Sequence, residues 1–237
     1  MTKKKAQTKK RIFLLEDHAV LRQCLKLFIE QEPDMEVCGG AGNAAEAFAA
    51  IKALQPDAVI TDISMPGMNG IEFLKNLKAL HPGIATVVLS MHDESIYAER
   101  ALRAGALGYV MKKESTGEVI AALRKAFVGE RHVGEKVTAS LVFQALGRNV
   151  PGKKESHSPI ETLSDRELEV FEHLGRGKST KDIAASLGVS AKTVETHRMH
   201  IKEKLQIGSV TELVQNAAVW VERETSGDWR VDRVADI

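Results

Sequence analysis

Five short apolar segments, separated by longer stretches with helical spacing, constrain the fold of the first half of the chain. The segments cover residues 12–15, 36–38, 58–61, 85–89 and 108–111. Their apolar residues do not alternate with polar ones, which is typical of strands covered on both faces in a parallel sheet. Between them, apolar residues recur every three or four positions in residues 19–31, 44–54, 70–80, 95–104 and 116–129. The pattern predicts an α/β domain of five βα units, with helices on both faces of the sheet.

Polar side chains follow four of the five predicted strands, at the point where each of the four ends. Glu16 and Asp17 follow the first strand, Asp62 the third, Ser90 the fourth and Lys112 the fifth. In a flavodoxin-like sheet of order 2-1-3-4-5 the first and third strands are neighbours, so the three carboxylates should share one crevice. Adjacent carboxylates repel unless a cation is present, and Mg²⁺ prefers oxygen ligands of this kind. We therefore expect a Mg²⁺ site in which Asp62 is a nucleophile toward a phosphoryl group, assisted by Lys112 and Ser90.

Four segments of this domain, LLEDH, VITDISMPGMNGIE, VVLSMHDE and GALGYVMKK, resemble the receiver domains of two-component response regulators. The resemblance covers about residues 11–131 and implies that a sensor histidine kinase donates a phosphoryl group to Asp62. The resemblance assigns the Mg²⁺ site to Glu16, Asp17, Asp62 and the backbone carbonyl of Ser64. It assigns the phosphoryl chemistry and the conformational switch to Asp62, Lys112, Ser90 and Tyr109.

The strand-end residues fit purely structural roles and related chemistries less well than phosphoryl transfer. Taken singly, Asp17 could cap a helix and Tyr109 could be a half-buried edge aromatic, so only the complete set favours function. A haloacid-dehalogenase-type phosphatase needs a second acid two positions after its nucleophile, where this chain has Ser64. A flavin-binding flavodoxin needs a phosphate loop after the first strand, where this chain has Glu16 and Asp17. We expect a protein that accepts a phosphoryl group and loses it by hydrolysis, and not a turnover enzyme.

Residues 161–221 have a different, all-helical pattern of four helices. Ser164, Ser179 and Ser209 are each followed three residues later by an acid, which is a capping-box pattern, and Ser190 is expected to cap another helix without one. Gly188 lies between two of these helices, and a short Gly turn between helices is typical of a helix-turn-helix. The first helix of this pair should bury Ile183, Ala184 and Leu187, and the second Val194, Ile201 and Leu205. The opposite side of the second helix, with Glu195, Thr196 and Met199, would enter the major groove of DNA.

The charge of this second domain depends on position. Residues 161–221 carry 8 basic and 9 acidic side chains, but residues 175–204, around the helix-turn-helix, carry 7 basic and 3 acidic ones. This local excess of positive charge can follow a phosphate backbone. By contrast, residues 12–131 carry 12 basic and 16 acidic side chains, which does not favour nucleic-acid binding by that domain.

The segments LSDREL, GKSTKDIAASLGVSAKTVETHRMHIKEKL and ELV resemble the LuxR-type DNA-binding domain of NarL/FixJ response regulators. The resemblance implies contacts to double-stranded promoter DNA from Lys192, Thr193, Glu195, Thr196, Arg198, Met199 and Lys204. Glu195 departs from family members that carry lysine at this position, and its carboxylate can accept a hydrogen bond from cytosine. The sequence alone therefore leaves the DNA site open.

The domain layout follows from these patterns. We predict a basic, disordered leader (1–11), a receiver domain (12–131), a linker (132–160), a helix-turn-helix domain (161–221) and a C-terminal tail (222–237). Within the linker, residues 137–146 have the spacing of a short helix. Cys24 and Cys38 are expected to be small buried hydrophobic residues. No apolar segment approaches the ~20 residues of a membrane helix, and the N-terminus does not resemble a secretory signal.

The two domains together predict a cytoplasmic transcription regulator. Its expected partners are a sensor histidine kinase, promoter DNA, RNA polymerase and, after phosphorylation, a second copy of the chain. No membrane contact is expected. The alternative is that the helical domain binds another protein rather than DNA, still under the control of phosphorylation.

Overall fold

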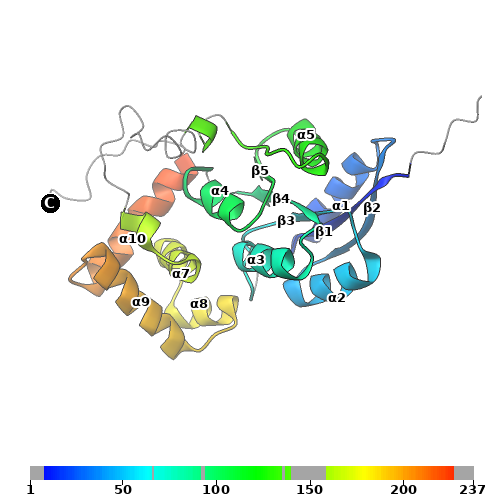
Figure 1. The fold of residues 1–237 in the computed structure, drawn as a ribbon. Helices are drawn as coiled ribbons and strands as arrows, with labels where there is room; N and C mark the ends of the chain where they lie inside the picture. The colour runs from blue at the N-terminus through cyan, green and yellow to red at the C-terminus, as the bar shows by residue number, and fades with distance from the viewer. Residues whose placement is uncertain (1–7, 66, 92–93, 135–136, 140–158, 227–237) are drawn as a thin grey trace, which may run out of the picture. The chain divides into compact units, whose positions relative to one another are not determined.

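The computed structural model describes residues 8–65, 67–91, 94–134, 137–139 and 159–226 (Figure 1). The chain divides into two compact units, residues 1–138 and 139–237. Our predictions for residues 1–7, 140–158 and 227–237 lie outside the described residues. Within the described ranges, no helix has the length and apolar character needed to cross a membrane.

The first unit contains the predicted parallel sheet, in the predicted order β2-β1-β3-β4-β5. The strands are β1 (Lys10–Leu15), β2 (Met35–Ala41), β3 (Ala58–Thr61), β4 (Ala85–Ser90) and β5 (Gly108–Met111). The helices are α1 (Ala19–Ile29), α2 (Ala44–Leu54), α3 (Gly70–Leu80), α4 (Glu94–Arg103) and α5 (Thr116–Phe127). The bounds of β3, β5, α2 and α3 are those that we predicted, and the fold class is confirmed.

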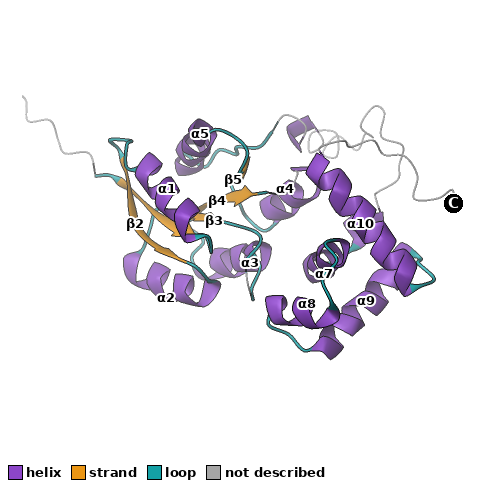
Figure 2. Ribbon diagram, turned by 180° about the vertical axis from the view of Figure 1, so that it is seen from behind, coloured by secondary structure: helices purple, strands orange, loops and turns teal. Residues whose placement is uncertain are grey.

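Successive residues of β1 face two separate apolar cores, one on each side of the sheet. Ile12 and Leu14 pack with residues of α1 and α5, whereas Phe13 and Leu15 pack with residues of α2 and α3. All four side chains are at most 1% exposed. The burial of consecutive residues explains why the strand shows no alternation in the sequence. Figure 2 shows these helix pairs on the two faces of the sheet.

Both ends of the first unit differ from the predicted boundaries. Strand β1 begins at Lys10, two residues earlier than we predicted, because the backbone N–H of Lys10 donates to the carbonyl of Asp34 (2.8 Å). Near the other end, His132 pairs with the edge of β5: Tyr109 N–H donates to the His132 carbonyl (2.9 Å) and His132 N–H to the Leu107 carbonyl (2.8 Å). The sheet thus holds the first residue of the segment that we predicted as linker. Of the predicted helix at 137–146, residues 137–139 are helical and the rest lies outside the described residues.

The second unit contains the four predicted helices, preceded by a single 3-10 turn, η1 (Pro159–Thr162). They are α7 (Asp165–Gly175), α8 (Thr180–Leu187), α9 (Ala191–Leu205) and α10 (Val210–Ser226). Five of the six predicted core residues are buried, namely Ile183, Ala184, Leu187, Val194 and Ile201. Leu205, at the end of α9, is only partly buried. Gly188 ends α8 with φ of 64°, a left-handed conformation that glycine adopts without the steric cost of a Cβ. This turn sets the second helix of the helix-turn-helix against the first.

Serine caps fix the starts of these helices. Ser164 and Ser179 form reciprocal capping boxes with Glu167 and Asp182, and Ser190 accepts from Thr193 N–H, as predicted. Helix α10 differs: Ser209 accepts from Glu212 N–H, but the Glu212 carboxylate accepts from Gly208 N–H and not from Ser209. Glu212 therefore bonds to Gly208, the residue before the Ser209 cap.

Our prediction that both cysteines are buried is wrong. Cys24 is exposed on α1, and Cys38 is half-buried in β2. The buried side of α1 is formed instead by Leu25 and Ile29, four residues apart. Helical periodicity places Cys24 one position away from that stripe, and one position is a rotation of about 100°.

Candidate functional site

Asp62 lies at the carboxyl end of β3, where the chain leaves the sheet. Its backbone N–H donates to the carbonyl of Leu15 (3.0 Å), which ties it to the end of β1. Its carboxylate Oδ1 accepts from the backbone N–H groups of Ile63 (2.6 Å) and Ser64 (3.3 Å). The side chain is 4% exposed. The carboxylate is therefore nearly buried and held in a fixed orientation.

The loop after Asp62 can close only because residue 70 is glycine. A Cβ at Gly70 would lie 2.1 Å from the Asp62 carbonyl oxygen and 2.7 Å from Cα of Ile63, far inside contact distance. Gly70 N–H also donates to the Ile63 carbonyl (2.9 Å). The absence of a side chain lets helix α3 begin directly against the end of β3. Backbone packing thus explains the glycine at position 70.

Lys112, at the end of β5, holds two carboxylates at once. Its Nζ lies 2.8 Å from Asp62 Oδ2 and 2.8 Å from Glu16 Oε2. The three side chains are 8%, 4% and 3% exposed, respectively. Burial alone would lower the pKa of the Lys112 ammonium, but the neighbouring carboxylates of Asp62 and Glu16 outweigh burial and raise it. The ammonium stays charged over the whole physiological pH range.

The predicted switch residues lie on the adjacent strands β4 and β5. Ser90 is 0% exposed and Tyr109 is 1% exposed. Lys112 N–H donates to the Ser90 carbonyl (2.7 Å), so the end of β4 positions the lysine. The structure thus brings Asp62, Lys112 and Glu16 into direct contact and ties the backbone of Ser90 to Lys112.

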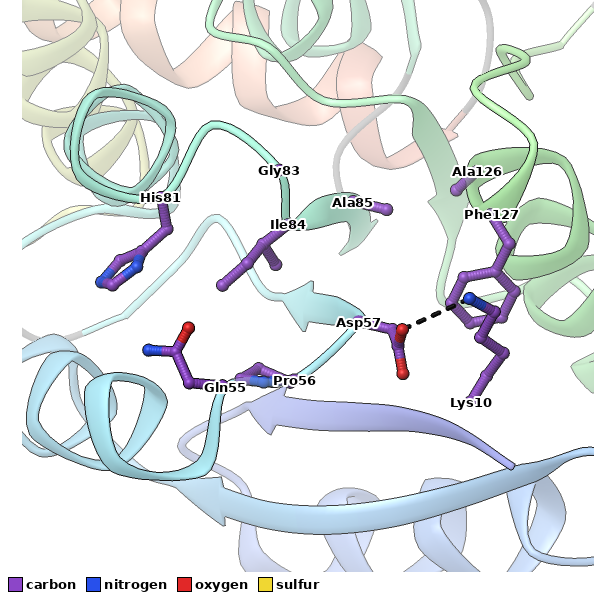
Figure 3. A pocket seen from close by; sticks show the side chains of 10 residues that line it. All are labelled: Lys10, Gln55, Pro56, Asp57, His81, Gly83, Ile84, Ala85, Ala126 and Phe127. Atoms are coloured by element: carbon purple, nitrogen blue, oxygen red, sulfur yellow. Dashed lines mark hydrogen bonds and ion pairs between the residues drawn. The ribbon is translucent and has the colours of Figure 1, made fainter. Parts of the chain in front are cut away.

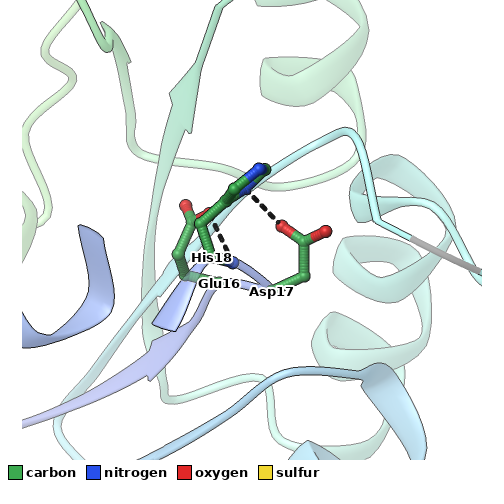
Figure 4. Close-up of side chains that lie close together, drawn as sticks. All are labelled: Glu16, Asp17 and His18. Atoms are coloured by element: carbon green, nitrogen blue, oxygen red, sulfur yellow. Dashed lines mark hydrogen bonds and ion pairs between the residues drawn. The ribbon is translucent and has the colours of Figure 1, made fainter. Parts of the chain in front are cut away.

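A second cluster involves the other acid of the predicted metal site. The side chains of Glu16, Asp17 and His18 converge after β1 (Figure 4), with their ligand atoms all within 4.8 Å of one another. His18 Nδ1 lies 2.9 Å from Asp17 Oδ1 and 3.2 Å from Glu16 Oε1. In the described part of the chain this is the one group of three metal-ligating side chains so close together, and Asp62 does not join it. We had not predicted His18, although it directly follows the two acids in LLEDH.

The donor set of this pocket fits a divalent cation. Carboxylate oxygens are the ligands that Mg²⁺ prefers. Asp17 Oδ1 is buried, and its 2.9 Å contact with His18 Nδ1 lacks the geometry of a hydrogen bond. Glu16 points one oxygen toward Lys112 and the other toward His18, so it belongs to both clusters. Lys112 pairs with Glu16 and Asp62 but not with Asp17, so a cation beside Asp17 would offset the negative charge of that carboxylate.

The predicted DNA-binding residues lie on α9, and five of them, Lys192, Glu195, Thr196, Met199 and Lys204, are exposed. Thr193 is half-buried, and its backbone N–H donates to Ser190 Oγ (3.0 Å). Thr196 Oγ1 donates to the Lys192 carbonyl (3.0 Å). These contacts leave the first two turns of α9 with a polar, solvent-facing side.

Two basic residues of the predicted interface are engaged within the domain. Arg198 Nη1 donates to Glu195 Oε1 (2.7 Å) and to Thr180 Oγ1 (2.9 Å), and its side chain is 14% exposed. Lys204 Nζ donates to the Glu167 carboxylate (2.6 Å) and to the Thr162 carbonyl (3.3 Å). Lys204 therefore joins the end of α9 to the start of α7, a structural contact that helical periodicity did not reveal.

One pocket lies at the opposite end of the sheet from Asp62. It has a volume of about 360 Å³ and is lined by residues at the starts of strands, including Lys10, Asp57 and Ala85 (Figure 3). Lys10 Nζ lies 3.3 Å from Asp57 Oδ1 across it. None of the predicted site residues lines this pocket.

Comparison with known families identifies both units. Residues 12–124 match the family described as "Response regulator receiver domain", and residues 161–217 match "Bacterial regulatory proteins, luxR family". The oxygen regulatory protein NreC of Staphylococcus carnosus (strain TM300) is 35% identical over 208 residues, which cover 87% of this chain and 96% of that protein. NreC of Staphylococcus epidermidis is 36% identical over 209 residues, with the same shares covered.

Solved structures agree with the fold. RcsB from Salmonella enterica serovar Typhimurium, bound to promoter rprA in the presence of the phosphomimetic BeF3-, covers 89% of this chain and 99% of its own, with a TM-score of 0.63 and 23% identity. A two-component response regulator of the LuxR family from Aurantimonas sp. SI85-9A1 covers 59% of this chain and 99% of its own, with a TM-score of 0.54 and 28% identity.

Proposed function

Because the chain belongs to the NarL/FixJ-type two-component response regulators, which join a receiver domain to a LuxR-type DNA-binding domain, we propose that phosphorylation of Asp62 controls its binding to promoter DNA. The observation that carries this proposal is the buried Asp62 carboxylate, fixed by Lys112 and by two backbone N–H groups. These contacts orient the carboxylate oxygens, and a nucleophile must be positioned in this way to attack.

In this proposal a sensor histidine kinase donates the phosphoryl group. An Asp62 oxygen attacks phosphorus, the phosphorus–nitrogen bond of the phosphohistidine breaks, and Lys112 Nζ stabilises the charge on the phosphoryl oxygens. Glu16, Asp17, Asp62 and the Ser64 carbonyl would hold Mg²⁺, which when bound neutralises charge on the carboxylates and on the phosphoryl group. The chain accepts one phosphoryl group and loses it by hydrolysis, so it does not turn over substrate as an enzyme does.

The signal then passes through the end of the sheet. The Ser90 hydroxyl would bind the phosphoryl oxygens, and Tyr109, on the neighbouring strand β5, would change its packing. The expected consequences are a homodimer, formed through the receiver or through α10, and contact with RNA polymerase on the promoter.

DNA binding would use the exposed side of α9 in the major groove. Glu195, Thr196 and Met199 would face base edges, and Lys192, Thr193, Arg198 and Lys204 would contact or neighbour phosphates. The Arg198 and Lys204 contacts within the domain would have to loosen or be shared for those two residues to reach DNA.

One experiment tests the nucleophile. The full chain is incubated with radiolabelled acetyl phosphate and Mg²⁺, alongside Asp62→Asn. We expect stoichiometric, hydroxylamine-labile labelling of the wild type and none of the variant. Equal labelling of Asp62→Asn would refute the assignment, and repeated turnover of acetyl phosphate would indicate a phosphatase instead.

A second experiment separates DNA binding from the alternative, a helical domain that binds protein. Mobility shifts on DNA selected from a random pool are measured at 50 to 200 mM salt, with and without phosphorylation. A DNA-binding domain that neutralises several phosphates should lose affinity by about tenfold or more over this range. Absence of any sequence-dependent shift in both phosphorylation states would favour the protein-binding alternative.

A further inference from the structure

The side chain of His18 lies against the carboxylates of Glu16 and Asp17, and helix capping does not explain this orientation. It is the N-cap residue of α1, but its side chain makes no capping hydrogen bond. The imidazole is 73% exposed and yet turns toward the Asp17 and Glu16 carboxylates (Figure 4). Its Nδ1 is within hydrogen-bond reach of Glu16 Oε1 (3.2 Å). The closer atom, Asp17 Oδ1 at 2.9 Å, is buried, and its contact with Nδ1 lacks the geometry of a hydrogen bond.

The spacing of these atoms matches the coordination shell of one cation. Ligands in neighbouring positions of an octahedral ion, with bonds of about 2.1 Å, lie about 3.0 Å apart. The distances from Nδ1 to Asp17 Oδ1 and to Glu16 Oε1 are 2.9 and 3.2 Å. The third distance, between the two carboxylates, is at most 4.8 Å. Such a distance suits ligands in neighbouring or in opposite positions of the coordination shell. Glu16 can contribute Oε1 while Oε2 keeps its ion pair with Lys112.

We propose that His18 Nδ1 is a ligand of the divalent cation in this pocket, beside Asp17 and Glu16. The inference rests on the proposed function, because it concerns the same cation site. Coordination would use the lone pair on Nδ1, with the ring hydrogen on Nε2. A nitrogen ligand suits transition ions better than Mg²⁺, so the pocket takes Mn²⁺, Co²⁺ or Ni²⁺ in a way that an all-oxygen site does not.

The direct test detects a nitrogen bound to the metal. Mn²⁺ is added to the full-length protein, and pulsed electron paramagnetic resonance measures the coupling of its electron spin to ¹⁴N. We expect an imidazole ¹⁴N coupling in the wild type, its loss in His18→Phe, and its retention in His200→Phe. His200 is an exposed histidine on α9 and serves as the matched control. The variant His18→Asp keeps a cation ligand without nitrogen and should bind Mn²⁺ with no coupling.

A calorimetric titration gives a second readout. His18→Phe should weaken Ni²⁺ binding by about tenfold or more and change Mg²⁺ binding by about threefold at most, because only the softer ion gains from imidazole. Bound Mn²⁺ without ¹⁴N coupling, coupling that persists in His18→Phe, or equal weakening for both ions would overturn the proposal.

Failure of this proposal is distinguishable from failure of the proposed function. Labelling of Asp62 by acetyl phosphate together with Mn²⁺ binding that shows no nitrogen coupling overturns the role of His18 alone. Absence of any bound cation overturns both the role of His18 and the Mg²⁺ site, whereas absence of Asp62 labelling overturns the proposed function itself.

Discussion

Replacing Lys112 by methionine should destabilise the first unit strongly, because the ammonium is the positive charge shared by Asp62 and Glu16. Each contact of 2.8 Å is worth about 6 kcal/mol of gross attraction at an effective dielectric of about 20. The desolvation of three nearly buried groups offsets most of this sum. Removing one member of a buried ion pair costs about 3–5 kcal/mol, because it leaves charge uncompensated. We expect Lys112→Met to lower the free energy of unfolding by that amount.

A double-mutant cycle identifies the cause. In an Asp62→Asn background only the Glu16 carboxylate is left without its partner when Lys112 is replaced. Lys112→Met should then lower the free energy of unfolding by about half as much, roughly 2 kcal/mol. Native-state hydrogen exchange of the full chain, with amides of β1, β3 and β4 resolved, measures the free energy of unfolding of the first unit at pH 7 in the absence of divalent cations.

Lys113→Met is the matched control, since Lys113 is the exposed neighbour of Lys112. It should change the free energy of unfolding by less than about 0.5 kcal/mol. A cost of Lys112→Met that does not exceed that of the control, or that is unchanged in the Asp62→Asn background, would refute the reasoning.

Three further predictions concern packing and pH. Gly70→Ala should lower both the melting temperature of the first unit and the rate of Asp62 labelling, because the new Cβ would lie 2.1 Å from the Asp62 carbonyl oxygen. A melting temperature equal to that of the wild type, measured by calorimetry, would contradict this. Lys204→Met should lower the free energy of unfolding of the second unit by about 1–2 kcal/mol, measured by urea unfolding, because it removes the ion-pair partner of the Glu167 carboxylate, which is 5% exposed. An unchanged free energy of unfolding would show that the ion pair does not stabilise the unit. Burial and the nearby Lys178 lower the pKa of His173 to about 4. Between pH 4 and 6.5 the unfolded chain therefore binds more protons than the folded chain, and the free energy of unfolding should fall as the pH is lowered through that window. His173→Gln should make the free energy of unfolding less dependent on pH, and an unchanged dependence would argue against this cause.

The sheet was predictable because burial on both faces leaves a direct mark on the sequence. Strands β3 and β5 and helices α2 and α3 have the predicted bounds, and the strand order, which we took from the flavodoxin-like fold, is confirmed. The start of β1 was missed because Lys10 is a charged residue held by backbone hydrogen bonds, which hydropathy cannot reveal. For the same reason, His132 looked like linker although it pairs with β5.

The candidate site was predictable as a set of strand ends but not as a set of contacts. The sequence placed Asp62, Glu16 and Lys112 at one edge, yet only the structure shows that the ammonium bridges the two carboxylates. His18 carried a signal, since it follows two acids, but a lone histidine at a helix start is usually structural. The contact of Lys204 with Glu167 joins residues 37 positions apart, and no local pattern encodes such a pair.

The central claim is that modification of Asp62 governs DNA binding by α9, and one titration tests it most directly. Fluorescence anisotropy measures the affinity of the full chain for a selected DNA duplex at fixed salt, before and after treatment with acetyl phosphate and Mg²⁺, for the wild type and for Asp62→Asn. The account predicts that treatment changes the Kd of the wild type by about tenfold and leaves that of the variant unchanged. An equal response of both proteins, or a phosphorylated wild type whose affinity does not move, would contradict it.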